Sequence, residues 1–143
     1  MRKTPLKKKQ GFKRKTSWLK HNPRTPKIAP RRIDLHRKAW STFSRWIRNR
    51  DKICITCGNR GNLEAGHFWH ACLDFDEINI NAQCTSCNHF KSGNLASYSV
   101  YLLNKYGEKA FKDLEQRHWL ALRGEYRTDQ QYLDIIKKYE LAD

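Results

Sequence analysis

Residues 54–88 read CITCGNRGNLEAGHFWHACLDFDEININAQCTSCN, and a Cys-x-x-Cys pair stands near each end, Cys54 with Cys57 and Cys84 with Cys87. Four thiolates in two close pairs match the tetrahedral ligand set of a structural zinc site. Each pair supplies two ligands from one tight turn, so zinc there would join two segments that are distant in sequence. We expect the ion to hold a short hairpin and the helix after it in a fixed relation, because binding at such sites contributes folding free energy.

The length and the cysteine usage set the broad class of the protein. A chain of 143 residues is expected to form one domain, with a disordered extension. No apolar run reaches the length of a membrane span, and the N-terminus lacks the apolar core of a signal peptide, so we expect no membrane association. Four of the five cysteines lie in the two pairs, which fits zinc in a reducing cytoplasm better than a disulfide framework. Cys72, the fifth, is interpreted as a free, partly buried thiol, and a spare metal ligand is the alternative.

The formal net charge of +15 is concentrated at the N-terminus. Residues 1–32 contain 13 Lys and Arg and no acid, whereas the rest of the chain contains 16 basic and 14 acidic residues. A block of like charge that also contains all four prolines is typical of a disordered segment. We interpret it as an arm that binds DNA phosphates, with a solubilising tail as the alternative. The basic residues assigned to DNA contacts in this arm are Lys7, Lys8, Lys9, Lys13, Arg14 and Lys15.

Residues 33–143 are predicted to form the zinc-containing domain, of α+β class. Hydrophobic periodicity and turn residues predict, in order, a helix over 35–50, a strand over 63–69, a second short strand or extended turn over 78–82, and helices over 95–106, 108–122 and 129–141. We expect Asp34 and Thr128 to cap the first and last of these helices. A helix is also expected to start after Cys87 and to break near Gly93. The C-terminal helices are interpreted as packing elements or a homodimer surface.

Polar residues between the cysteine pairs suit phosphodiester hydrolysis, which needs a group that activates water and a divalent cation that stabilises charge on the phosphate. His67 is the candidate base because imidazole titrates near neutral pH, and on its strand it is expected to face the helix after Cys87. Asn88 offers an amide oxygen that suits a hard cation such as magnesium or manganese. Asn79 is expected to orient the strand by hydrogen bonds to the backbone of the intervening loop.

These residues carry a resemblance to the ββα-metal nucleases, also called HNH or His-Me finger nucleases. The motifs are Gly66-His67, Asn79 five residues before a cysteine, and Cys84-x-x-Cys87-Asn88. Within that group the chain most resembles the NinG (Rap) recombination proteins of phage lambda, and phage junction resolvases of the endonuclease VII type are similar too. The likeness is good over about residues 50–105. It implies a small zinc-clamped ββα-metal core with flanking α-helices.

The resemblance also implies a function. It indicates a magnesium- or manganese-dependent endonuclease that cuts branched DNA, such as Holliday junctions or D-loops, in the host cytoplasm during phage recombination. His67 would be the general base, Asn79 the residue that orders the loop, and Asn88 the metal ligand. The alternative is a non-catalytic zinc-ribbon DNA-binding accessory protein of recombination, which four cysteines and a basic arm would serve equally well.

Two positions depart from the nuclease pattern. Gly66 stands where many of these enzymes carry an acidic metal ligand, and Lys91 stands where the junction resolvases place another acid. The catalytic cation would then need other ligands, of which the candidates are His67, Asp74, Asp76 and His89. His67 could therefore bind metal while His70 acts as the base. Lys91 is interpreted as a phosphate contact, and a loop-capping carboxylate is the alternative role for Asp76.

Overall fold

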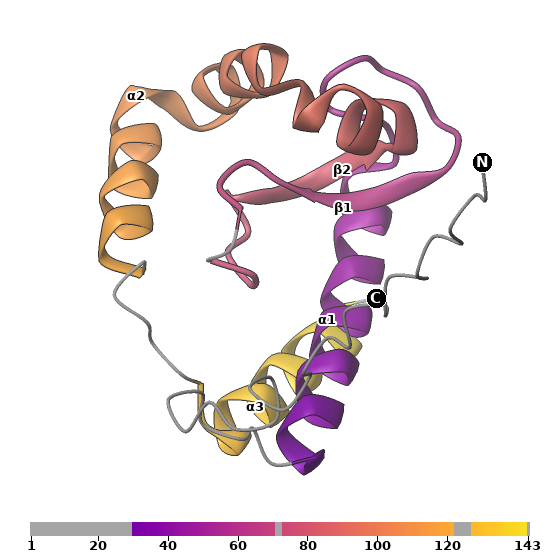
Figure 1. Ribbon diagram of the computed structural model, residues 1–143, viewed down its shortest axis with the longest axis vertical. Helices are drawn as coiled ribbons and strands as arrows, with labels where there is room; N and C mark the ends of the chain where they lie inside the picture. The colour runs from indigo at the N-terminus through magenta and orange to yellow at the C-terminus, as the bar shows by residue number, and fades with distance from the viewer. Residues whose placement is uncertain (1–29, 71–72, 122–126, 143) are drawn as a thin grey trace, which may run out of the picture.

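The computed structural model describes residues 30–70, 73–121 and 127–142 (Figure 1). Its elements are α1 (Pro30–Asp51), β1 (Leu63–His67), β2 (Ile80–Cys84), the π-helical turn η2 (Ser86–Phe90), the 3-10 turn η3 (Ser92–Asn94), α2 (Leu95–Ala121) and α3 (Asp129–Glu140). The predicted α+β class is confirmed, whereas the finer ββα-metal assignment stays a prediction. The arm to residue 29, with its six candidate DNA contacts, lies outside the described residues, as does Cys72. No helix in the described part of the chain is long and apolar enough to cross a membrane.

Helix α1 is longer than the helix predicted over 35–50. It begins at Pro30, so Asp34 lies inside the helix and the prediction that Asp34 caps it is wrong. Proline is favoured at the first helical position because its φ angle is preset and its missing N–H would have no intrahelical partner. Residues 30–32, which the charge pattern placed in the arm, therefore belong to this helix.

Strands β1 and β2 pair antiparallel, with Leu63 opposite Cys84 and His67 opposite Ile80. The second strand begins two residues later than predicted, because the carboxylate of Asp76 accepts hydrogen bonds from the amides of residues 78 and 79 and holds them in a turn. Side chains alternate between the two faces of a strand. One face of this hairpin packs against α1, and the other lies against the segment that leads into α2.

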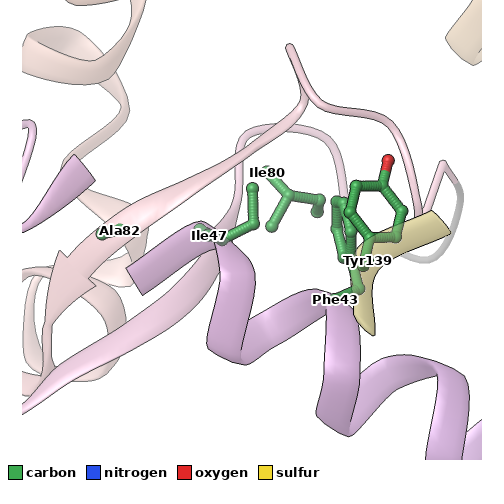
Figure 2. Close-up of a cluster of buried hydrophobic side chains, with 5 residues drawn as sticks. All are labelled: Phe43, Ile47, Ile80, Ala82 and Tyr139. Atoms are coloured by element: carbon green, nitrogen blue, oxygen red, sulfur yellow. The ribbon is translucent and has the colours of Figure 1, made fainter. Parts of the chain in front are cut away.

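The main apolar core lies between the hairpin, α1 and α3. Figure 2 shows Phe43 and Ile47 of α1 meeting Ile80 of β2 and Tyr139 of α3, with Ala82 further along β2. All five side chains are almost completely buried. Full burial of a side chain of the size of Ile or Phe stabilises the fold by about 1.5–3 kcal/mol. This cluster therefore fixes the hairpin on α1.

The last turn of α1 also covers the outer edge of β2. Asp51 accepts the Ala82 amide at 2.8 Å, and the amide of Ile55 donates to the Ala82 carbonyl at 2.9 Å. The guanidinium of Arg50 donates to the carbonyl of Ile80 at 3.2 Å and is paired with Asp51. Backbone groups that a second strand would otherwise bind are thus satisfied by the residues around the end of α1.

Helix α2 is broken at Gly107, whose φ of 81° and ψ of 167° lie outside the helical region. This left-handed φ is readily adopted only by glycine. The halves on either side correspond to the predicted helices 95–106 and 108–122, and they run in different directions (Figure 1). Tyr98 and Leu102 from the first half and Leu114 from the second half build another core around Phe68. The predicted break at this glycine is confirmed.

Helix α3 begins where the sequence predicted. The side chain of Thr128 accepts the amide of Gln131, and the side chain of Gln131 returns a bond to the amide of Thr128, which makes a capping box. The predicted break after η2 is also present, at Gly93. Helix α3 packs on α1 through Tyr132, Ile136 and Tyr139, so its predicted packing role is confirmed.

Candidate metal and active site

The four cysteines of the two pairs come together beside the end of the hairpin. Their Sγ atoms all lie within 4.8 Å of one another, and those of Cys57 and Cys84 are 3.7 Å apart. Four sulfurs around a tetrahedral zinc at about 2.3 Å would be separated by about 3.8 Å, so the cluster fits that ion. The predicted set of thiol ligands is therefore assembled, and it can bind a metal such as zinc.

The thiols of this cluster differ in how readily they ionise. Burial opposes ionisation of the Cys54 thiol, but hydrogen bonds from Thr56 and from the Cys84 amide lower its pKa to about 6. The backbone of Asn59 favours the thiolate of Cys57, yet the neighbouring cysteines outweigh it and raise the Cys57 pKa to about 12. A divalent cation would remove this competition, because thiols that coordinate a metal lose their protons outright.

His67 ends β1 with its ring against α1. Its Nε2 lies 3.3 Å from Oδ1 of Asp74, and its ring stacks on Trp40 with 5.2 Å between centroids. The prediction that His67 faces the helix after Cys87 is wrong, because strand alternation puts its side chain on the α1 face with residues 63 and 65. A carboxylate bound at Nε2 favours the tautomer with the proton there, which leaves Nδ1 to accept one.

Asp74 connects His67 to a second histidine. Its other oxygen lies 3.5 Å from Nε2 of His36. The hydrogen bond with His67 lowers the pKa of Asp74 below its ordinary value, with a smaller contribution from His36 that opposes the effect of burial. The sequence proposed Asp74 as a metal ligand, and its position as the partner of His67 was not predicted. His70 is exposed, and its ring centroid lies 5.9 Å from that of His67.

Asn79 makes the loop contacts expected of it. Its buried side chain accepts the Trp69 amide at 2.7 Å and donates to the carbonyls of Trp69 and Leu73 at 3.1 and 3.4 Å. These bonds join the two ends of the loop that leads out of β1 and back into β2. Asn79 thereby sets the path of the chain directly after His67.

Asp76 has the alternative role that the sequence offered. One carboxylate oxygen accepts the amides of Ile78 and Asn79 at 2.9 and 3.0 Å, and the other pairs with Arg117 of α2. Its side chain is only 13% exposed. Asp76 is therefore occupied as a loop cap and an anchor for α2, rather than open toward a cation.

Asn88 lies on η2 against the opposite face of β1 from His67. Its Nδ2 donates to Oε2 of Glu64 at 2.7 Å, and Nε2 of His89 lies 2.6 Å from the same oxygen. Thr85 donates to the other carboxylate oxygen at 2.8 Å. Burial raises the pKa of Glu64, but these hydrogen bonds outweigh it and hold the pKa below its ordinary value.

Sequence reasoning missed Glu64. Glu64 and Gly66 are two residues apart on a strand, so their Cα–Cβ directions point to the same face. Glu64 therefore places a carboxylate on the face where many ββα-metal nucleases have an acid at the position of Gly66. The two-residue period of a strand was the signal that could have identified Glu64. Lys91, the remaining candidate, is exposed just after η2.

Similarity to known proteins extends over most of the chain. The family model described as the bacteriophage lambda NinG protein matches residues 1–142. "Protein ninG" of Escherichia phage 933W is 43% identical over 77 residues, which are 50% of this chain and 38% of the relative. The proteins of the same name from Salmonella phage P22 and Escherichia phage lambda are 42% and 40% identical over the same shares. The chain thus spans about two fifths of the length of these relatives. No solved structure matches it.

Proposed function

The chain belongs to the NinG family of lambdoid bacteriophage proteins, and we propose that it is a metal-dependent endonuclease that hydrolyses phosphodiesters in branched DNA during phage recombination. Holliday junctions and D-loops are the proposed substrates, and the host cytoplasm is the proposed location. The observation that carries the proposal is the placement of consecutive residues of β1. His67 is held by Asp74, and the preceding Gly66 lies beside the amide oxygen of Asn88.

The proposed base is His67. With Nε2 hydrogen-bonded to Asp74, Nδ1 would take a proton from the attacking water as the new bond to phosphorus forms. The carboxylate of Asp74 would stabilise the imidazolium that results, and the Trp40 ring stacked on His67 would keep it from rotating. A base oriented by a third group in this way is a recurring arrangement in hydrolytic sites.

The proposed cation ligands lie on the other face of β1. Magnesium or manganese, when bound, would stabilise negative charge on the phosphate and on the leaving oxygen. The amide oxygen of Asn88 and the carboxylate of Glu64 are hard oxygen donors of the type that these ions prefer. Cys84 ends β2 and Cys87 lies in η2 directly before Asn88, so zinc at the thiol cluster would fix Asn88 without taking part in the chemistry.

Contacts to DNA are proposed for two regions. Lys91 is exposed three residues after Asn88, where it would meet a phosphate next to the scissile one. The basic segment before residue 30 would bind phosphates further away and release counterions. Removal of that segment should weaken binding to all DNA substrates and reduce its salt dependence. A homodimer would suit symmetrical cutting of a junction.

The test is cleavage of labelled four-way junction, D-loop and linear duplex DNA by the zinc-loaded full-length chain, with magnesium or manganese. We expect cutting that is strongest on branched substrates. Either His67→Ala or Asn88→Ala should reduce the rate by about 100-fold or more while DNA affinity is kept. Asn104→Ala, at an exposed position of α2, is the matched control and should cut like the parent.

A non-catalytic DNA-binding accessory protein remains the second candidate function. It is favoured by the thiol cluster and the basic N-terminus, neither of which requires His67. Tight binding of branched DNA by a zinc-loaded parent that cuts none of the substrates would support it. The same result would contradict the endonuclease proposal.

A further inference from the structure

The side chain of Gln83 is buried in an unusual way. It is completely inaccessible, and its Nε2 donates to the carbonyl of Gly93 at 2.6 Å. Because a carbonyl accepts this bond, the amide atom beside Gly93 must be the nitrogen of Gln83 and the opposite atom its oxygen. The opposite atom, Oε1, has no hydrogen-bond partner within the described part of the chain. A buried acceptor without a partner costs about 1–3 kcal/mol, so some group that is not part of the protein is expected beside it.

A second amide oxygen points to the same place. Nδ2 of Asn88 donates to Glu64, which directs Oδ1 of Asn88 away from that carboxylate and toward β1. A Cβ atom built on Gly66 would lie 2.3 Å from Oε1 of Gln83 and 3.1 Å from Oδ1 of Asn88. Both oxygens therefore lie beside Gly66, and the oxygen of Gln83 occupies the position that a side chain there would need.

Two amide oxygens cannot hydrogen-bond to each other, so their convergence calls for a donor or a cation between them. Glu64 is the register partner of Gln83 across the hairpin and adds a negative charge on the same face. Amide and carboxylate oxygens are the ligands that magnesium, manganese and calcium prefer, whereas zinc is better served by the thiol cluster.

We propose that Gln83, Asn88 and Glu64 form a second metal site, for a hard divalent cation, beside Gly66. The inference rests on the proposed function for the use of this ion, and it deepens that function by adding Gln83 as a ligand and by giving Glu64 the role of balancing the charge. Oε1 of Gln83 and Oδ1 of Asn88 bind the cation, and the Glu64 carboxylate balances its charge. His67, on the other face of β1, is not a ligand.

The test uses Mn²⁺ alone as the probe, titrated into the zinc-loaded full-length chain without DNA and followed by electron paramagnetic resonance of free Mn²⁺. We expect one saturable site in the parent. Glu64→Gln should weaken it by about tenfold or more. Gly66→Ala should abolish it, because the added methyl group would displace Oε1 of Gln83. Glu108→Gln and Gly61→Ala are the matched controls, since Glu108 is 73% exposed on α2 and a Cβ at Gly61 would meet only Asn59, at 3.4 Å.

The outcomes separate this site from the proposed reaction. His67→Ala should bind Mn²⁺ like the parent, and loss of binding in that variant would overturn the assignment of ligands. Equal binding by Gly66→Ala, or no saturable Mn²⁺ site in a folded parent, would also overturn it and leave a bridging water between the two amides. Binding that depends on Glu64 and Gly66 in a protein that cuts no DNA would support the site and contradict the endonuclease proposal.

Circular dichroism of each variant shows whether it is folded. Should Gly66→Ala fail to fold, Glu64→Gln decides alone, because Glu64 is 36% exposed and its replacement keeps the shape of the side chain.

Discussion

The two faces of the β1–β2 hairpin differ in chemistry, although they are built from the same ten residues. On the face toward α1, Ile80 and Ala82 are fully buried among apolar side chains. On the face toward η2 and the start of α2, the fully buried side chains of β2 are Asn81 and Gln83. A hairpin that had only to be stable would not need buried amides, because each must find partners to offset its desolvation.

The partners of those amides show which face serves function. Asn81 is satisfied by the guanidinium of Arg50, the Ile78 carbonyl and the Tyr98 hydroxyl, so it fixes the strand between α1 and α2. Gln83 is satisfied at its nitrogen only. Sites that break a local rule of good packing are often functional sites. The apolar side chains of the α1 face therefore supply stability, with the proposed base His67 at the end of that face, and the polar face is where a metal ion is expected.

Removal of zinc should have the largest effect on stability. The thiol cluster joins the segment after α1 to the end of β2 and the start of η2, so it supports both faces of the hairpin. Structural zinc sites contribute an apparent free energy of about 10–16 kcal/mol in small domains, so a strong zinc chelator should unfold the hairpin and its surroundings. Circular dichroism and tryptophan fluorescence would follow the loss. Withholding magnesium and manganese is the control and should leave the fold intact, and a hairpin that persists after complete zinc removal would break the comparison.

Truncation of a side chain on the apolar face should have the second-largest effect. Ile80→Ala should lower the free energy of unfolding by about 3 kcal/mol, because it leaves a cavity against Phe43 and Ile47. Urea denaturation measures the change, and Val100→Ala, at a side chain that is 57% exposed on α2, should stay within about 0.5 kcal/mol of the parent. The rate of DNA cleavage per folded molecule should not change. A large loss of cleavage rate in folded Ile80→Ala would contradict the assignment of this apolar side chain to stability alone.

Asp74→Asn tests the role of the carboxylate that binds His67, the proposed base at the end of β1. The variant keeps the shape of the side chain but loses the charge that orients His67 and stabilises its imidazolium, so kcat should fall by about 10–100-fold with little change in KM. Asp113→Asn, an exposed substitution on α2, is the control. An equal rise in KM with constant kcat would instead assign Asp74 to substrate binding.

Acid should loosen the attachment of α3, with the smallest effect. Burial raises the pKa of Glu77, but bonds from Lys138 and Tyr139 outweigh it and lower the pKa below the ordinary value of about 4.3. Because the folded-state pKa is depressed, the stabilisation is present above that ordinary value and is lost as the pH falls through the folded-state pKa.

Urea denaturation between pH 3 and 7 measures this contribution as the difference between parent and Glu77→Gln. We expect less than about 1 kcal/mol above pH 5, since the ion pair is exposed, and a difference that shrinks toward pH 3. Glu108→Gln should show no such trend. A difference that grows on acidification would have the wrong sign for a depressed pKa.

The sequence predicted those features that depend on nearby residues. The two Cys-x-x-Cys pairs, the breaks at Gly93 and Gly107, and the Thr128 cap each follow from the chemistry of one short stretch. The start of β2 was missed because the carboxylate of Asp76 holds the next residues in a turn, which no periodicity reports. The face of His67 was missed because it depends on which side of the hairpin α1 covers.

Long-range partners account for the rest of what the sequence left open. Asp74 meets both His67 and His36, and the second of these comes from a helix almost forty positions earlier in the chain. The orphaned oxygen of Gln83 exists only because its nitrogen is taken by the carbonyl of Gly93. Such pairings are set by packing between elements, so composition and spacing give no sign of them.

The cover that the end of α1 places over β2 has a consequence for assembly. An open strand edge is a template for pairing with another chain, and it leads to strand exchange and aggregation unless it is blocked. Here Arg50, Asp51 and Ile55 already bind the outward backbone groups of Ile80 and Ala82. A second copy of the chain cannot extend the sheet at β2 while these bonds are kept, so strand exchange at this edge would first require the end of α1 to move away.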